Sequence, residues 1–386
     1  MSLSPFRLLC ACGLLAILST TMAKNPVLPL FAAHLGAGPE GIGLVAALSP
    51  LAGVLVSIPG GLCSDRFGRR RLLLASSVVF ASAPLVYLLV TDVWGLALAR
   101  FYHGLATGVF MPVGQAAVAD AFKASRGEKM GAFSSATLAG RFVAPMLGGA
   151  ALGLGFAWVY GLCALAGIGA MLLVWRLPDF GERPAPSCRP PLREGLAQLF
   201  SSRAILGGCL LEAGMLFAYG IFEAFLPVLA LERGYAPWLT GVLFSVQVVT
   251  VALTKPLFGR LSDKRGRVGQ MLWGAAFTAG ACAALPWVGL AGMFVLSMLL
   301  GLSLSLATAA SGAFVADRSA ATNRGAAMGL LGALMDIGHS TGPLLGGLAA
   351  ALAGSGGAFW LGAATLLGCV AASRAMTAEP LGEERA

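Results

Sequence analysis

The chain has 386 residues, of which 58% are hydrophobic, 11% are charged and 53 are glycine. A soluble domain of this size needs about twice that charged fraction, so the composition excludes one. A membrane-spanning helix takes about 20 apolar residues, and about twelve such helices would take up roughly 240 residues. The net charge of +9 does not come from a basic soluble module, so no nucleic-acid partner is expected.

Twelve apolar segments, separated by short polar or Gly/Pro breaks, predict twelve membrane-spanning helices. The segments cover 7–33, 41–63, 72–90, 94–118, 131–153, 157–176, 204–230, 237–258, 269–288, 290–315, 326–352 and 357–375. They are too long and too uniformly apolar for barrel strands, and lipid offers no hydrogen-bond partner to an open backbone. The first segment begins like a signal peptide, but apolar residues continue past Ala23, so we expect it to be retained as a span.

The basic residues indicate an orientation in the membrane. Of the 26 Lys and Arg residues, 21 lie in the even-numbered connections and the two tails, four lie within spans, and Arg233 lies in an odd-numbered connection. By the positive-inside rule, this asymmetry places both termini in the cytoplasm. We expect a multi-pass protein of the cell membrane, specifically a bacterial inner membrane.

One long polar connection divides the chain. Residues 177–203 contain five prolines among basic residues, a composition typical of a linker. We therefore expect an N-terminal six-helix bundle at 1–176, a cytoplasmic linker at 177–203, and a C-terminal six-helix bundle at 204–386 that ends in a short cytoplasmic tail.

The two halves match each other at an offset of 198 positions, as Pro29 and Pro227 illustrate. Further identical pairs are Asp65 with Asp263, Arg69 with Arg267, Arg126 with Arg324, Gly140 with Gly338, Pro145 with Pro343, Gly148 with Gly346 and Gly149 with Gly347. These matches indicate an internal duplication. Because six spans is an even number, the halves share one orientation and are related by a pseudo-two-fold axis along the membrane normal. This arrangement is typical of secondary transporters, with the substrate path between the halves.

A short motif occurs in both halves, between the second and third spans of each. The first copy has Gly61, Asp65, Gly68 and Arg69, and the second has Gly259, Asp263, Gly266 and Arg267. The motif resembles the signature loop of the major facilitator superfamily. The resemblance implies that the loop latches the outward-facing state, with Asp65 at the start of the eleventh helix and Arg69 paired with Asp120. A basic loop that serves only topology would not explain Gly and Asp twice at one spacing.

Arg100 lies seven residues inside the fourth span and is followed by His103, Gly104 and Gly108. An arginine at this depth is costly unless it faces a cavity or a partner. The pattern resembles the second motif of the same family, which implies a role for Arg100 in proton transfer. The alternatives are an Arg100 that extends to the outer interface, and a His103 that is only a packed neighbour.

The fifth span contains Gly140, Ala144, Pro145, Gly148 and Gly149. This spacing resembles the family motif associated with antiporters, except that Ala144 stands where the pattern has glycine. The copy in the eleventh span has Gly at that position, and such duplicated small residues also serve as ordinary packing surfaces. The resemblance implies export of substrate in exchange for another solute.

Further charged residues lie within the spans. They are Lys24, Arg141, Glu212, Glu223 and Asp336. Glu212 and Glu223 are eleven residues apart, so they share one face of the seventh helix with Tyr219 between them. In the family fold, helices 1, 4, 7 and 10 line the cavity, which would bring Lys24, Arg100, Glu212 and Glu223 towards one space. The alternative is static ion pairing that fixes helix packing.

These observations give two sets of candidate residues. The proposed proton-coupling residues are Arg100, Glu212, Glu223 and Asp336. The proposed substrate-cavity residues are Lys24, Asn25, His103, Arg141 and Tyr219. Burial and a nearby cation act in opposite directions on the proton affinity of a carboxylate, and a proton-coupled switch requires that competition.

No lysine is followed by Ser or Thr, so the chain has no Walker A loop and ATP bound to it cannot drive transport. The eight cysteines form no CxxC pair and the three histidines are scattered, so no metal site, cofactor or enzyme activity is expected. We expect a monomeric exporter of drug-like or amphiphilic small molecules that works by alternating access and proton antiport. The alternatives are a proton-coupled importer, a sugar or metabolite exporter, and a receptor or scaffold that kept the fold without transporting.

Overall fold

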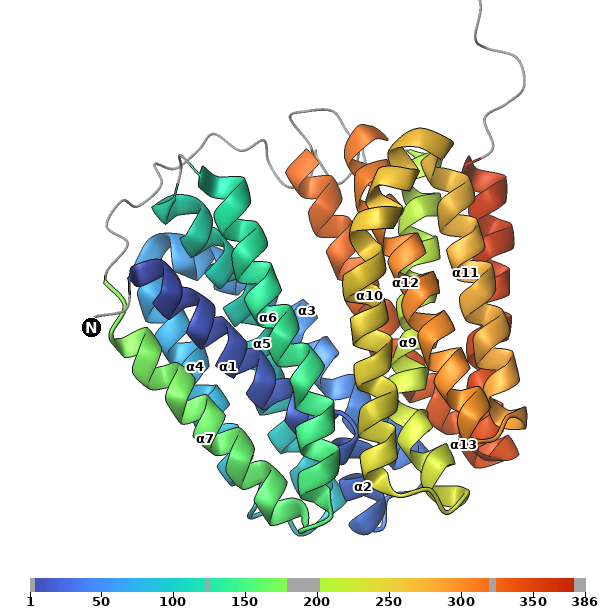
Figure 1. Cartoon of the computed structure of the whole chain (residues 1–386), viewed down its shortest axis with the longest axis horizontal. Coiled ribbons are helices and arrows are strands. Elements are labelled where there is room, and N and C mark those ends of the chain that lie inside the picture. The colour runs from blue at the N-terminus through green and yellow to red at the C-terminus, as the bar shows by residue number, and fades with distance from the viewer. Residues whose placement is uncertain (1–3, 123–124, 179–201, 319–323, 378–386) are drawn as a thin grey trace, which may run out of the picture.

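The computed structural model describes residues 4–122, 125–178, 202–318 and 324–377, and these are almost entirely helical (Figure 1). The helices are α1 (Pro5–Lys24), α2 (Val27–His34), α3 (Pro39–Phe67), α4 (Arg69–Tyr87), α5 (Val93–Ala121), α6 (Arg126–Leu152), α7 (Phe156–Trp175), α9 (Arg203–Glu232), α10 (Pro237–Arg265), α11 (Arg267–Ala284), the 3-10 helix η2 (Leu285–Trp287), α12 (Leu290–Arg318) and α13 (Arg324–Thr377). Most of the expected linker, 179–201, and the tail from 378 onwards lie outside the described residues.

Within the described residues, nine helical segments are long and apolar enough to cross a membrane. One of them, in α13, contains two helices, because Ala353 and Gly354 have non-helical backbone angles. Helices α5 and α6 have 29 and 27 residues, which is also sufficient for a span. The described part of the chain therefore holds twelve spans, and the expected all-helical membrane fold is confirmed.

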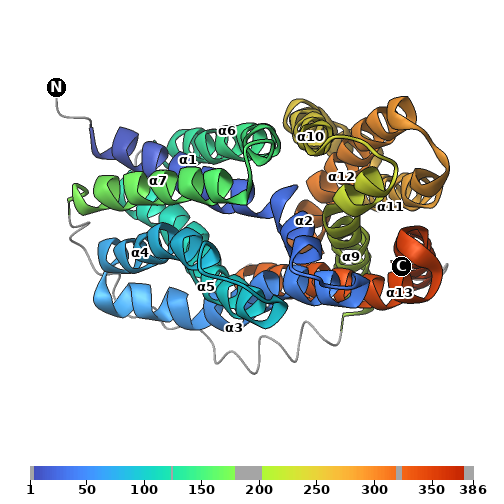
Figure 2. The ribbon, with the colours of Figure 1, turned by 90° about the horizontal axis from the view of Figure 1, so that it is seen from below.

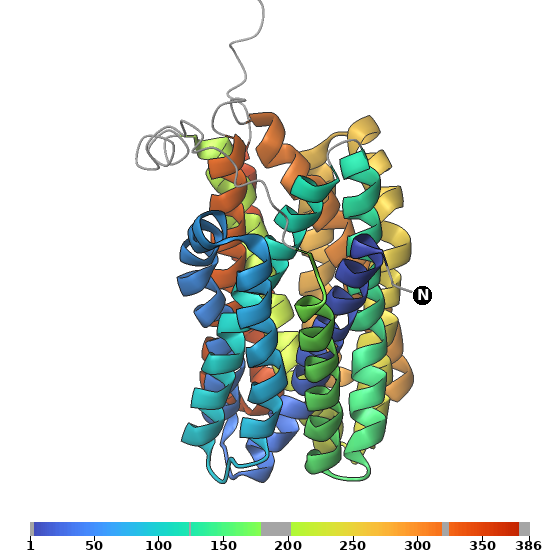
Figure 3. The ribbon, with the colours of Figure 1, turned by 90° about the vertical axis from the view of Figure 1, so that its left-hand side faces the viewer.

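The helices form two halves that lie side by side (Figures 1 and 2). Helices α1–α7 make the N-terminal half, whose helices run next to one another between its two ends (Figure 3), and α9–α13 make the C-terminal half. A core cluster that includes Leu9, Phe80 and Phe110 belongs to the N-terminal half alone. A larger cluster joins residues of both halves, among them Phe31 and Phe225. The halves are thus packed together along part of their length.

Two equivalent helix contacts join the halves on opposite flanks (Figure 2). Helix α3 meets α13 where Gly43 lies against the carbonyl group of Pro343, and α10 meets α6 where Gly241 lies against the carbonyl group of Pro145. Gly43 with Gly241, and Pro145 with Pro343, are pairs at the offset of 198. The contacts are therefore related by the internal two-fold axis that the sequence predicts.

Both contacts lie towards the same end of the molecule, where α3 and α10 begin. The connections 35–38 and 153–155 belong to this end, which we call the closed end. At the other end the two halves lean apart (Figure 1). The halves are therefore in contact at one end and apart at the other (Figure 1).

Candidate functional site

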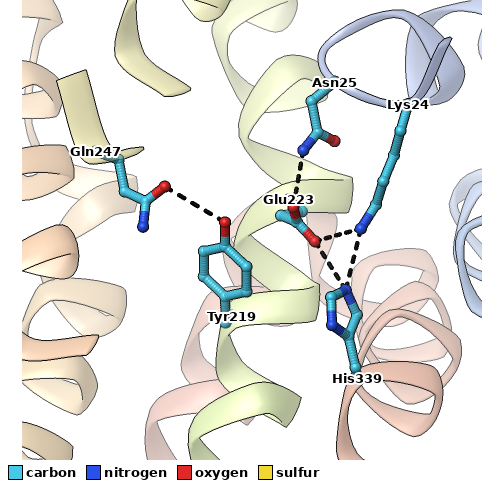
Figure 4. Close-up of polar contacts among 6 residues, drawn as sticks. All are labelled: Lys24, Asn25, Tyr219, Glu223, Gln247 and His339. Atoms are coloured by element: carbon cyan, nitrogen blue, oxygen red, sulfur yellow. Dashed lines mark hydrogen bonds and ion pairs between the residues drawn. The ribbon is translucent and has the colours of Figure 1, made fainter. Parts of the chain in front are cut away.

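Four polar residues meet between the halves, next to the closed end, and we call them the central cluster: Lys24, Asn25, Glu223 and His339 (Figure 4). Lys24 and Asn25 come from the end of α1, Glu223 comes from α9 and His339 comes from α13. The cluster therefore joins the N-terminal half to the C-terminal half through side chains.

Both carboxylate oxygens of Glu223 are occupied. Oε1 accepts a hydrogen bond of 2.8 Å from Asn25 Nδ2. Oε2 lies 2.5 Å from Lys24 Nζ and 2.8 Å from His339 Nε2. Glu223 is only 7% exposed, so these bonds replace the water that an ionised carboxylate needs. The arrangement favours an ionised Glu223 while the halves are in contact.

His339 can serve only one of its two neighbours at a time. Its Nε2 atom lies 3.1 Å from Lys24 Nζ as well as 2.8 Å from Glu223 Oε2. An unprotonated Nε2 accepts a hydrogen bond from the lysine, whereas a protonated Nε2 donates to the carboxylate. A change of proton position on His339 therefore shifts hydrogen bonding from one half of the molecule to the other.

Local sequence explains how these side chains meet. Helix α1 ends at Lys24, and Asn25 has an extended backbone before Pro26, after which the chain resumes as α2. On the other half, a side chain at Gly220 would overlap the ring of Pro343. The glycine lets α9 approach α13 closely, which brings Glu223 beside His339.

The central cluster lines a small pocket together with apolar residues of α2, α3, α9 and α13. The pocket has room for about one water molecule, so an organic molecule does not fit there in this conformation. Its polar wall consists of the four cluster residues. The pocket is therefore a place for a proton or a water molecule next to the closed end.

Two members of the cluster occupy equivalent places in the duplication. Asn25 and Glu223 are 198 positions apart and bond to each other directly. Equivalent residues can touch only where they lie close to the two-fold axis. His339 is equivalent to Arg141, and the sequence reasoning did not assign His339 a role. The offset that relates it to Arg141 is the signal that could have identified it.

Tyr219, one turn before Glu223 in α9, contacts other helices of its own C-terminal half. Its hydroxyl donates to Gln247 Oε1 at 3.3 Å, and its ring lies edge-on to His339 at 6.0 Å between centroids (Figure 4). It therefore orients the histidine from the side opposite Lys24.

Arg141 and Lys255 are exposed residues within helices α6 and α10. Arg141 acts electrostatically on Lys24, Lys255 and His339. Glu212 is 1% exposed and lies beside Ser311, within range of the Lys255 charge. Because eleven residues of helix span about 16 Å, Glu212 lies well apart from Glu223. The two acids thus belong to different surroundings.

Arg100 and His103 lie inside the N-terminal half rather than at the central pocket. Arg100 is 2% exposed and interacts with the Tyr87 hydroxyl. His103 is fully buried, with Nδ1 3.2 Å from the same hydroxyl and its ring packed on Phe80. Arg100 acts on Lys24 through its charge. The structure therefore connects Arg100 to the central cluster by electrostatics and places His103 behind it.

Asp336 is partly buried on α13, one turn before His339. Within the described residues it makes no ion pair and no hydrogen bond. Its surroundings exclude water from part of the side chain. It is therefore separate from the central cluster.

The repeated loop motif brings Arg and Asp together in both halves. Arg69 Nε lies 3.2 Å from Asp120 Oδ2, the pair that the family resemblance implies. Arg267 lies 2.9 Å from Asp317, which sequence reasoning did not identify. Gly68 and Gly266 have positive φ angles of 98° and 88° and join two helices, which explains glycine at both positions.

The other positions of the repeated loop motif are only partly described by the structure. Gly259 lies in α10. The side chain of Asp65 and that of Asp263 lie outside the described residues, as does the environment of Gly61. The expected contact of Asp65 with the eleventh helix stays a prediction.

If the loop acts as the latch that the family resemblance implies, Asp120→Asn should reduce transport strongly while leaving membrane insertion intact, because Arg69 would lose the charge of Asp120 at the end where the halves lean apart (Figure 1). The measurement is uptake into proteoliposomes at matched protein density, with Glu128→Gln as the control because Glu128 is exposed and its ion pair within the described residues is with the adjacent Lys129. Equal transport by Asp120→Asn and Glu128→Gln would show that the loop serves topology alone.

The glycine motif of α6 packs against two helices. Gly140 lies against the backbone of Leu14, and Gly148 lies against that of Met22, both in α1. Pro145 and Gly149 instead contact α10 across the boundary between the halves. Ala144 is fully buried, so its methyl group is accommodated. The copy in α13 makes the equivalent contacts, so this motif forms the closed end in both halves.

The arrangement can bind and release a proton at a carboxylate that is bonded to side chains of both halves. Within the described residues, no group of three His, Cys, Asp or Glu side chains could hold a metal ion.

Comparison with known proteins agrees with this architecture. The family model of the Major Facilitator Superfamily matches residues 9–292 and 239–385. A 3-(3-hydroxy-phenyl)propionate transporter of Escherichia coli (strain K12) is 29% identical over 322 residues, 78% of this chain and 76% of that protein. Multidrug resistance protein 2 of Bacillus subtilis (strain 168) is 22% identical over 334 residues, 84% and 83% of the two chains.

Among solved structures, the nucleoside transporter NupG superposes with a TM-score of 0.82 at 14% identity, covering 98% of this chain and 100% of that one. This likeness concerns the fold. The family match and the named relatives indicate a transporter rather than an enzyme. The chain belongs to the major facilitator superfamily.

Proposed function

We propose that the chain is a proton-coupled secondary active transporter in which Glu223 carries the coupling proton. The observation that supports this most strongly is the position of its carboxylate, bonded to Lys24 and Asn25 of one half and His339 of the other. Opening the closed end must separate these partners. Protonation of Glu223 removes the charge that holds Lys24, so the proton lowers the cost of that separation.

The positive-inside distribution of Lys and Arg supports an orientation with both termini in the cytoplasm. In that orientation the end at which the halves lean apart faces the cytoplasm. The proposed state is therefore inward-facing, with the central cluster next to the periplasmic closure in a bacterial inner membrane.

The first proposed mode is export of drug-like or amphiphilic molecules in exchange for protons by the monomer. The glycine motif of α6 and the multidrug resistance relative support this mode. Exchange follows if substrate binding and protonation of the central cluster exclude each other.

A second mode, uptake of substrate together with protons, is supported by the relative named as a 3-(3-hydroxy-phenyl)propionate transporter. In this mode substrate and proton favour each other's binding. The same residues serve both modes, and the sign of the coupling differs.

The sign of proton movement on binding separates the modes. Substrate added to purified protein in weakly buffered detergent solution should release protons in the first mode and take them up in the second. A pH-sensitive dye records either change. A binding reaction that moves no protons, confirmed by calorimetry in buffers of different ionisation enthalpy, would contradict proton coupling in both modes.

A further inference from the structure

Arg141 has the place in α6 that His339 of the central cluster has in α13, because the two residues are 198 positions apart. It lies in the middle of α6, is exposed, and acts electrostatically on four groups of four other helices. These groups are Lys24 on α1, Tyr219 on α9, Lys255 on α10 and His339 on α13. A side chain on the outer face of α6 could not lie near all four helices, so the guanidinium is directed to the side of α6 on which the central cluster lies.

The side chains around Arg141 offer more accessible positive than negative charge. Lys24 is paired with Glu223, whose two oxygens are both occupied. Glu212 is buried beside Ser311, and Asp336 is partly buried and makes no ion pair among the described residues. Arg141 makes no ion pair within the described part of the chain. Arg141 is thus exposed and without an accessible carboxylate, whereas Lys255 has the buried Glu212 as its nearest negative charge.

An arginine within a membrane span is costly unless a partner or water compensates its charge. Its planar guanidinium donates two parallel hydrogen bonds to a carboxylate, which a lysine cannot do. We propose that Arg141, with Lys255 beside it, binds the anionic group of the substrate, so that the substrate class is an organic anion such as an amphiphilic carboxylate. This inference rests on the proposed transport function and not on its direction.

An anion held at Arg141 lies in the same electrostatic field as Lys24 and His339. Added negative charge there favours the proton-loaded form of the central cluster. Binding of an acid should therefore take up protons, as in the second mode.

The test uses matched probes that differ only in charge. The probes are 3-phenylpropionate, 3-phenylpropanol and 3-phenylpropylamine, with octanoate, octanol and octylamine as a second series. Binding to the purified full chain is measured by calorimetry at neutral pH, where the acids are anions and the amines are cations. The acids should bind, the alcohols should bind weakly and the amines should not bind.

Arg141→Gln should weaken acid binding at least about tenfold, the effect of removing one partner of an enclosed ion pair. Arg141→Lys should keep part of the affinity, because it retains the charge without the planar fork. Arg374→Gln removes the same charge from an exposed position in the last turn of α13 and should leave binding unchanged. A single symmetric gel-filtration peak for each variant shows that folding is retained.

Three results would overturn the assignment: stronger binding of the amines than of the acids, equal acid affinity in Arg141→Gln and the original chain, or no binding by either acid. Amine binding accompanied by proton release would leave the proposed exchange function intact and remove only the anion assignment. Acid binding that depends on Arg141 but moves no protons would support the anion assignment and contradict the proposed proton coupling.

Discussion

Glu223→Gln should abolish proton-driven accumulation of substrate while leaving substrate binding and downhill exchange in place. Glutamine keeps the shape and one oxygen acceptor of the side chain but cannot take up a proton or pair with a charged Lys24. The expected loss is large because the carboxylate has bonds to both halves. The measurement is substrate accumulation in proteoliposomes with an imposed pH gradient, compared with counterflow exchange without a gradient.

Glu232→Gln is the matched control, because Glu232 is the last residue of the same helix and accepts a hydrogen bond of 2.5 Å from Ser355. It should accumulate substrate normally. Accumulation that survives in Glu223→Gln and also in Glu212→Gln would place the coupling group elsewhere, with Asp336 as the next candidate.

Gly241→Val should stop the closed end from forming and thereby block transport. A Cβ at this position would overlap the carbonyl group of Pro145 on the facing helix α6, and backbone on both sides leaves little room to relax. The same argument predicts a similar effect for Gly43→Val, which meets Pro343. Because these contacts join the halves, each half should still fold. Transport should fall to background while membrane expression is retained.

Spin labels at positions 154 and 231 report on this closure, because Leu154 and Leu231 are exposed near the closed end on different halves. Gly241→Val should lengthen the distance between the labels. Gly104→Val is the control, because its side chain would overlap Ser49 of α3 within one half and should lower thermal stability instead. An unchanged label distance and normal transport in Gly241→Val would contradict the assignment of this contact as a gate.

Hydropathy and the repeat determine much of this architecture. The twelve apolar segments correspond to the spans, and the offset of 198 anticipates the equivalent contacts of Gly43 and Gly241. The apolar segments and the repeat are both visible in the order of the residues, so a single sequence displays them directly.

The residues of the site were less accessible to sequence reasoning. Lys24 and Glu223 were expected in one space and are bonded, and the family resemblance anticipated Arg69 with Asp120. His339 and Asp317 were missed because their partners depend on how each helix is rotated about its axis. The burial of Arg100 inside its own half also depends on rotation. Hydropathy does not record that angle when a span is apolar all round.

The central claim is that Glu223 takes up and releases the coupling proton, and infrared difference spectroscopy of the purified protein tests it most directly. A change of pH or addition of substrate should produce the carbonyl stretch of a protonated carboxyl group. We predict that this signal is absent from Glu223→Gln and unchanged in Glu232→Gln. A signal of equal size in Glu223→Gln would contradict the claim, because another carboxyl group would then carry the proton.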